Sequence, residues 1–342
     1  MIEQFQLALP HGITLSCRAT GERGRPVLVF LHGFPEAAFV WDELLAHFAQ
    51  PANGGYRCVA PNLRGFEQSS APVDVSAYRP KHLVQDIAAL IAAESPGGPI
   101  ECLVAHDWGG AVAWNLANQQ PHLIKRLAIV NSPHPGTFLR ELKTSPKQQA
   151  ASAYMNFLIR PDAETLLAEN DFARMWPFFS KAKDGASMPA WLSGAVKDQY
   201  RAIWGAGLTG GCNYYRASPL RPPRPEDPGA AAIDLPHAML TVNVPTLVVW
   251  GLDDVALPPE LIDGLDAYIP RLTLHRIEGA SHWIIHEQPQ LVARHLGDFL
   301  RRSVTSVGVS VNPRLARRAG LEALVHPVIL LGHGAHHAFE PD

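Results

Sequence analysis

The sequence predicts an α/β fold in which a mostly parallel central sheet is flanked by helices on both faces. Short apolar runs alternate with helix-length amphipathic stretches up to residue 130, and the same alternation returns after residue 245. Between these two parts, strand signals are scarce and aromatic side chains are frequent. We therefore expect one core domain made of residues 1–131 and 241–302, interrupted by an inserted helical cap domain at 132–240.

The first half of the core is expected to begin with a hairpin formed by residues 2–8 and 12–19, which a Pro-His-Gly turn separates. Continuous apolar runs then indicate strands buried on both faces of a sheet, at residues 27–31, 56–60, 100–105 and 127–130. Helical spacing of apolar residues indicates the connections between them, at residues 41–50, 81–93 and 110–120. Strand and helix alternation of this kind is typical of parallel pairing.

The cap segment is expected to be helical, with helices at residues 146–157, 163–169 and 189–206 and a Pro-rich loop at 219–228. The core then resumes with alternating strands and helices, at residues 246–250, 263–268, 272–277 and 289–300. The last residues, 303–342, match no structural template and form a C-terminal extension of unknown structure.

Composition narrows the class of protein. The chain has 342 residues, of which 47% are hydrophobic and 18% charged, which suits a globular protein with a sizeable core. Its formal net charge of -3 favours neither a nucleic acid nor an acidic membrane surface as a partner. The four cysteines are scattered without a CxxC pair, and no leader or membrane-spanning run is visible. We therefore expect reduced thiols and a cytoplasmic location.

Residues 104–110, Val-Ala-His-Asp-Trp-Gly-Gly, have the order of apolar strand, sharp turn and helix that is typical of a nucleophile elbow. Asp107 stands at the nucleophile position, with the small residues Ala105 and Gly109 two places to either side. A carboxylate is ionised at pH 7 and can attack a saturated carbon, whereas a serine attacks acyl carbon. The elbow therefore favours epoxide opening or halide displacement. The alternative is that Asp107 only caps the following helix.

A second motif, His32-Gly33-Phe34-Pro35, directly follows the first expected parallel strand. This order places backbone N–H groups beside the elbow, at the carboxyl edge of the sheet. We expect the N–H groups of Phe34 and Trp108 to form an oxyanion hole. An ordinary strand-ending turn is the alternative for this motif.

Two residues in the C-terminal half complete a possible triad. Asp254 comes just after the expected strand at 246–250, and His282 comes just after the one at 272–277. Together with Asp107 they give the order nucleophile, acid, histidine, which is the chain order of the α/β-hydrolase triad. The neighbouring Asp253 competes for the role of the acid.

Five short motifs occur along the chain: HGFPE at 32–36, LRGF at 63–66, SAP at 70–72, HDWGG at 106–110 and NSPHP at 131–135. Together they resemble the α/β-hydrolase-fold epoxide hydrolases, over about residues 1–300. One departure is Glu67, which stands where the family's usual RGYG has its second glycine, so this loop is expected to differ in shape.

The resemblance implies two cap tyrosines whose hydroxyls hold the epoxide oxygen. Tyr154 fits the first, because Pro161 follows it seven places on, and Tyr215 fits the second, within the Asn-Tyr-Tyr-Arg run at 213–216. Substrate contacts are further expected from the elbow and from the turn after the first parallel strand, namely from His32, Gly33, Pro35 and Trp108.

The implied reaction converts a small apolar epoxide and water into a vicinal diol. Asp107 would form an alkyl-enzyme ester while a tyrosine, with an ordinary pKa of about 10, protonates the opening oxygen. Water activated by His282, which Asp254 orients, would then hydrolyse the ester. No cofactor and no metal are expected, and the oligomeric state is left open, a homo-oligomer included.

Two other functions remain open at this stage. A haloalkane or haloacid dehalogenase on the same fold also uses an aspartate nucleophile, but its halide needs N–H donors, and Phe34 has none in its side chain. A non-catalytic ligand-binding scaffold is also possible, since fold does not fix function. The histidines of the C-terminal extension lack cysteine or carboxylate partners at metal-ligand spacing, so no metal site is predicted there.

Overall fold

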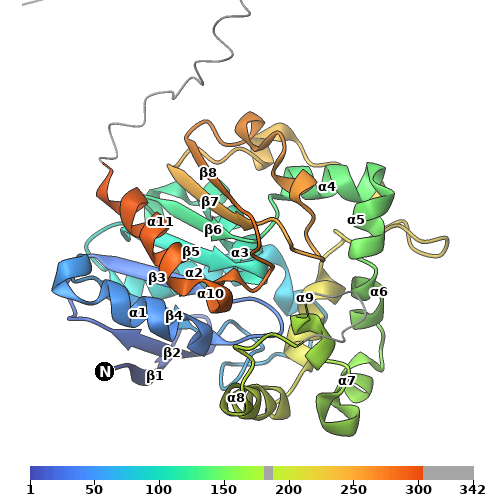
Figure 1. Cartoon of the computed structure of the whole chain (residues 1–342), viewed down its shortest axis with the longest axis horizontal. Coiled ribbons are helices and arrows are strands. Elements are labelled where there is room, and N and C mark those ends of the chain that lie inside the picture. Colours follow the sequence, from blue (N-terminus) through green and yellow to red (C-terminus); the bar gives the residue numbers. More distant parts are fainter. Residues whose placement is uncertain (181–187, 303–342) are drawn as a thin grey trace, which may run out of the picture. The chain divides into compact units, whose positions relative to one another are not determined.

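The computed structural model describes residues 1–180 and 188–302 (Figure 1). At its centre is an eight-stranded sheet with the strand order β1-β2-β4-β3-β5-β6-β7-β8. β2 is antiparallel to β1 and to β4, whereas all other neighbours are parallel. This sheet confirms the predicted fold class. The C-terminal extension predicted at 303–342 lies outside the described residues.

The strands lie close to their predicted positions: β1 Glu3–Ala8, β2 Thr14–Thr20, β3 Val27–Leu31, β4 Arg57–Pro61, β5 Cys102–His106, β6 Leu127–Val130, β7 Thr246–Gly251 and β8 Leu272–Ile277. The predicted hairpin is the pair β1 and β2. β5 begins later than residue 100, because Ile100 forms only an isolated bridge with Ile124.

Helices cover both faces of this sheet: α1 Asp42–Phe48, α2 Pro80–Glu94, α3 Asp107–Gln119, α10 Ile284–Glu287 and α11 Pro289–Arg301. Successive residues of a strand point to opposite faces, so Val29 of β3 packs into the core with α2 and α3. Its neighbour Phe30 packs into a second core with α1 and α11, which lie together on one face in Figure 1. Burial on both faces explains why the central strands are continuous apolar runs.

The segment between β6 and β7 contains helices and no strand among its described residues: α4 Pro135–Thr144, α5 Pro146–Ala151, α6 Tyr154–Leu158, α7 Ala163–Phe172, α8 Gly194–Gly205 and α9 Thr209–Ala217. Short 3₁₀ turns complete the chain: η1 Ala38–Trp41, η2 Pro51–Asn53, η3 Val75–Tyr78, η4 Pro121–Leu123, η5 Trp176–Phe179, η6 Gly229–Ala232, η7 His237–Met239, η8 Pro259–Ile262 and η9 Leu265–Ala267. In the part of the chain that the structure describes, no helix has both the length and the apolar character needed to cross a bilayer.

Several helix boundaries differ from the prediction. The helix predicted over 146–157 is divided into α5 and α6 at Ser152 and Ala153. Just before the break, Gln148 Nε2 donates to Ser152 Oγ (2.8 Å) and to the Ala256 carbonyl (3.1 Å). α8 begins only at Gly194, where the Ser193 side chain caps it. α4 and α9 were not predicted, and the helix predicted at 263–268 is only a 3₁₀ turn.

Glu67 adopts a backbone conformation that glycine adopts more readily than other residues. Its φ is 50°, in the left-handed region. The Glu67 carboxylate accepts hydrogen bonds from Ser16 Oγ and Asn62 Nδ2, both at 2.5 Å, which anchor the loop in this conformation. Hydrogen bonds of its side chain thus stabilise in Glu67 the conformation that a glycine would adopt without such support.

The cap docks on the core through a close approach of two backbones. A Cβ added to Gly210 of α9 would lie 2.2 Å from the Gly65 carbonyl oxygen and 2.3 Å from Gly65 Cα. Nearby, the Tyr214 hydroxyl donates to the Arg64 carbonyl at 3.0 Å. This contact fixes the position of α9, which also contains Tyr215.

Gly210→Ala should therefore lower the free energy of unfolding by about 1–3 kcal/mol, because the added methyl overpacks a contact between backbones that cannot rotate away. Gly205→Ala is the matched control, since no atom lies within 4 Å of its added Cβ and alanine favours helix by up to about 1 kcal/mol. Urea unfolding of both variants tests this. Equal stability of the two would contradict the close approach.

Candidate active site

Asp107 is the first residue of α3, directly after β5, and its φ of 50° is unusual for a residue with a side chain. The turn requires glycine at position 109, because the neighbouring chain comes very close. A Cβ on Gly109 would lie 2.5 Å from the carbonyl oxygens of Leu31 and His32. Ser132 Oγ donates to the Asp107 carbonyl at 2.6 Å. Asp107 does not act as a side-chain cap of α3, whose N-cap is His106. The strained turn presents its carboxylate at the carboxyl edge of the sheet.

Backbone N–H groups interact with this carboxylate. The Phe34 N–H donates to Asp107 Oδ1 at 2.8 Å, and the Trp108 N–H is also hydrogen-bonded to the carboxylate. Gly33 lies against it so closely that a Cβ there would be 2.2 Å from Oδ1. The two N–H groups that were predicted to form an oxyanion hole therefore both lie at the Asp107 carboxylate.

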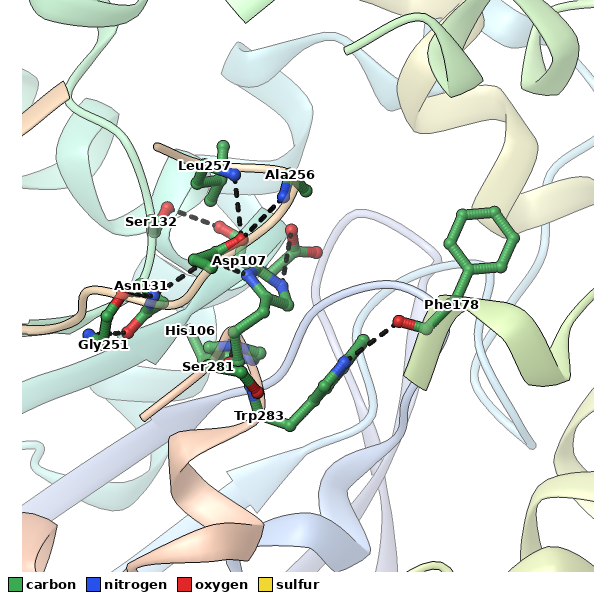
Figure 2. A network of polar contacts seen from close by, with 12 residues as sticks. His106, Asp107, Asn131, Ser132, Phe178, Gly251, Ala256, Leu257, Ser281 and Trp283 are labelled. Carbon is green, nitrogen blue, oxygen red and sulfur yellow. Dashed lines mark hydrogen bonds and ion pairs between the residues drawn. The ribbon is translucent and has the colours of Figure 1, made fainter. Parts of the chain in front are cut away.

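His282 lies between two carboxylates. Figure 2 shows one of them, Asp107, near Asn131, Ala256 and Leu257. Its Nε2 is 3.6 Å from Asp107 Oδ2, and its Nδ1 is 2.7 Å from Asp254 Oδ2. Asp254 is fully buried and its other oxygen accepts the backbone N–H groups of Ala256 (2.9 Å) and Leu257 (2.8 Å). The structure thus brings Asp254 to His282, while the competing Asp253 is exposed.

The charges of the three groups depend on one another. Burial opposes ionisation of Asp107, but hydrogen bonding and charge attraction from His282 outweigh it and hold the carboxyl pKa below its usual value. Burial alone would lower the pKa of His282, but Asp254 and Asp107 raise it to about 10. The resting site is therefore an imidazolium between two carboxylates.

Tyr154 of α6 and Tyr215 of α9 face this site from the cap. Their ring centroids are 6.0 Å apart, with the two rings edge to face. The Trp108 ring packs edge-on against the Tyr215 ring, at 5.0 Å between centroids. Burial, with the nearby Asp107 carboxylate, raises the pKa of both phenols far above the ordinary value, so both remain protonated donors.

Two cavities meet at Asp107 and Tyr154. The first, of about 230 Å³, has mostly apolar walls on the Trp108 side, including Leu83, Val112, Phe138 and Met155. The second, of about 580 Å³, lies on the His282 side and is lined by Phe34, Phe178, Tyr215 and Trp283, with Arg174 and Asp253 adding charge. The nucleophile candidate is therefore open to space on two sides.

Known proteins share this architecture. A profile of the α/β hydrolase fold family matches residues 26–289. The chain belongs to the α/β-hydrolase family. It is 32% identical to the Bacillus subtilis AB hydrolase superfamily protein YfhM, over 86% of this chain and 97% of that one. It is also 32% identical to Epoxide hydrolase 1 of Caenorhabditis elegans, over 83% and 67% of the two chains.

A solved structure shows the same likeness in three dimensions. A chain from a study of novel epoxide hydrolases of this superfamily, found in metagenomes from hot environments, superposes with a TM-score of 0.77 and 35% identity. The superposition covers 89% of this chain and all (100%) of the other.

Asn131 belongs to this site, although no role was predicted for it. At the end of β6, with a φ of 38°, its amide donates to Asp254 Oδ2 at 2.9 Å and accepts the Gly251 N–H at 2.8 Å. The NSPHP motif contains Asn131, but its role depends on β6 and β7 being neighbours, which spacing along the chain does not show.

A buried carboxylate beneath the triad was also missed. Glu36 is fully buried, and its Oε1 accepts hydrogen bonds from Tyr200 Oη (2.8 Å) and His286 Nε2 (2.6 Å). Burial opposes its ionisation, but His286 and His106 hold its pKa well below the usual range. His106 Nε2 in turn contacts the His282 carbonyl at 2.9 Å. The Glu36 carboxylate therefore lies behind the triad histidine, with His106 between them.

The predicted substrate contacts divide into two groups. Trp108 lines the first cavity. Gly33 is packed against the Asp107 carboxylate, and His32 and Pro35 line neither of the two cavities that meet there. His32 is fully buried, with Nδ1 against the Gly33 carbonyl (2.9 Å) and Nε2 accepting the Leu63 N–H (3.0 Å), so both nitrogens support the turn.

Residues 1–180 and 188–302 contain no cluster of three or more side chains able to hold a metal ion. The histidines of the C-terminal extension lie outside the described residues.

The pKa of His282 gives a testable pH dependence. The pKa of His282 is about 10 in the folded state, above the usual value of about 6.5. Protonation of His282 therefore stabilises the fold fully below about pH 6.5, and this stabilisation is lost as the pH rises toward 10.

Asp254→Asn removes the carboxylate that raises the pKa of His282 most, so this pKa should fall markedly. NMR titration of labelled histidines measures it. Asp253→Asn is the matched control, and a pKa equally low in both variants would contradict the assignment.

Proposed function

We propose that this chain is an epoxide hydrolase, which converts an epoxide and water into a vicinal diol through an ester on Asp107. The observation that carries the proposal is the pair of protonated tyrosines facing a carboxylate nucleophile, rather than a serine, in an oxyanion hole. Relatives whose names describe them as epoxide hydrolases, over most of the chain, support it.

In the first step, Asp107 Oδ2 attacks one carbon of the epoxide, and the C–O bond of the ring breaks. Oδ1 stays on the Phe34 N–H, which leaves Oδ2 free to react. Tyr154 and Tyr215 bind the epoxide oxygen, and one of them donates its proton as negative charge develops there. Without this proton the alkoxide would be a poor leaving group.

The ester changes the charge balance around His282. Asp107 is now neutral, so one cause of the high imidazole pKa is lost and His282 can release its proton. That proton restores the phenol that protonated the substrate. A neutral base is thus formed at the moment when water has to be activated.

In the second step, His282 takes a proton from water, and the hydroxide attacks the ester carbonyl. Asp254 stabilises the imidazolium, and the oxyanion hole binds the oxygen that becomes negative. Collapse of the tetrahedral intermediate passes the remaining water proton to the departing alkoxide. The diol leaves, with Asp107 ionised and His282 protonated as at the start.

The two cavities support a small, mainly apolar epoxide as the substrate. Because both adjoin Asp107 and Tyr154, an epoxide with a substituent on each carbon can place one in each cavity. The apolar walls of the first cavity favour an aryl or alkyl group there. Water, the second substrate, has space on the His282 side.

A dehalogenase is less well supported by the same geometry. A leaving halide requires N–H donors and no proton. Two phenols instead stand where a leaving oxygen would need protons. The complete triad likewise favours an enzyme over a non-catalytic scaffold.

The cysteines support a reducing compartment such as the cytoplasm. Cys17, Cys58, Cys102 and Cys212 are all free and buried. Burial raises the pKa of Cys17, Cys58 and Cys212 to about 12 and that of Cys102 still higher, so all four remain protonated thiols.

His282→Gln should form the ester but not hydrolyse it, because no base is left to activate water. After mixing with trans-stilbene oxide, intact-protein mass spectrometry should show one added substrate mass per chain, absent in Asp107→Ala. The wild type should form diol from trans-stilbene or styrene oxide and release no halide from a haloalkane. Halide release without diol would make the protein a dehalogenase. An adduct on the Asp107→Ala variant would exclude Asp107 as the nucleophile.

Tyr154→Phe and Tyr215→Phe should each slow ester formation by about 10- to 100-fold, and the double variant by about 10⁴-fold, because general acids contribute on this order. Tyr78→Phe is the matched control, since the Tyr78 hydroxyl donates to the Pro72 carbonyl at 2.8 Å and lies outside α9. Rapid quenching of a single turnover, with mass spectrometry of the alkyl-enzyme, measures ester formation. A double variant as fast as Tyr78→Phe would remove the tyrosines from the mechanism.

A further inference from the structure

We infer that helix α8 of the cap positions the oxyanion hole, through Trp204 and Tyr200, and thereby supports hydrolysis of the ester more than its formation. The inference rests on the proposed function. It makes the two side chains positioning residues, which act on the reaction through the loop at residues 33–36.

The contacts follow the loop residue by residue. Phe34 donates its N–H to Asp107 Oδ1 at 2.8 Å. The next residue, Pro35, accepts the Trp204 indole N–H on its carbonyl oxygen at 2.7 Å. The residue after that, Glu36, accepts the Tyr200 hydroxyl at 2.8 Å. The donor to the nucleophile is therefore joined directly to two anchors on α8.

Both anchors are buried and come from one face of α8. Tyr200 is 0% exposed and Trp204 3% exposed, and residues four apart on a helix lie on the same side. Their rings stack on each other at 5.3 Å, and Phe179 packs against both. Within this aromatic packing the Pro35 carbonyl and the Glu36 carboxylate are held in fixed positions.

Loss of either anchor affects the two chemical steps differently. In the resting enzyme the Phe34 N–H holds a carboxylate whose charge is shared between two oxygens. In the tetrahedral intermediate the same N–H must stabilise an oxygen that bears a full negative charge. An interaction that is stronger at that stage lowers the barrier of that step. A displaced loop therefore slows hydrolysis more than ester formation.

Trp204→Phe tests the inference, because it keeps an aromatic ring and removes the N–H. Trp176→Phe is the matched control: its ring also contacts Trp204 (4.7 Å), but its N–H donates to the Asp171 carbonyl, within the cap. Rapid quenching with trans-stilbene oxide, followed by mass spectrometry and diol analysis, gives the rate constants of both steps. Tyr200→Phe provides a second, independent removal of an anchor.

Trp204→Phe should lower the hydrolysis rate constant about tenfold, less than the roughly 10²- to 10³-fold cost of removing an oxyanion donor. Ester formation should change less than about threefold, so that the alkyl-enzyme accumulates. Tyr200→Phe should act in the same direction, and Trp176→Phe should leave the ratio of the two rate constants unchanged.

Equal ratios in Trp204→Phe and Trp176→Phe, or a parallel fall of both rate constants, would overturn the inference while the proposed function stands, since the wild type would still form adduct and diol. A wild type that forms neither from any epoxide tested would overturn the proposed function and this inference with it. Thermal unfolding of the variants separates loss of fold from loss of the hydrolysis step.

Discussion

The site depends on one constraint, the holding of a charged carboxylate at a left-handed backbone position between two backbone N–H groups. Asp107 can occupy this position only because the neighbouring chain is bare of side chains, at Gly33 and Gly109 in particular. The strain is balanced by packing of the buried central strands, β5 among them, and of the buried face of α3. Rigid elements therefore determine the direction of the nucleophile, and the cap contributes the groups that face it.

The electrostatics of the site form a second level of organisation. His282 is cationic between Asp107 and Asp254, and Glu36 provides a further buried negative charge on the far side of His106. Each of these charges is balanced by partners on other strands and loops. As a result, a change of charge on Asp107 during the reaction alters the basicity of His282 without any movement of the fold.

The sequence predicted the parallel sheet well, because strands buried on both faces leave continuous apolar runs. It also placed Asp107, Asp254 and His282 at strand ends, where parallel topology brings them together. It could not place Asn131 or Glu36, whose roles arise from strand order and from cap packing. The cap boundaries were predicted less well, because they depend on local capping, such as that of α8 by the Ser193 side chain.

The burial of the four cysteines has a consequence for a protein that handles electrophiles. An epoxide alkylates any accessible thiolate, and such damage would compete with turnover. Cys17, Cys58, Cys102 and Cys212 are both shielded from the cavities and held in the unreactive thiol form. In the proposed reaction, the chain thus keeps its softest nucleophiles away from the substrate, and Asp107 is left as the group that the epoxide meets.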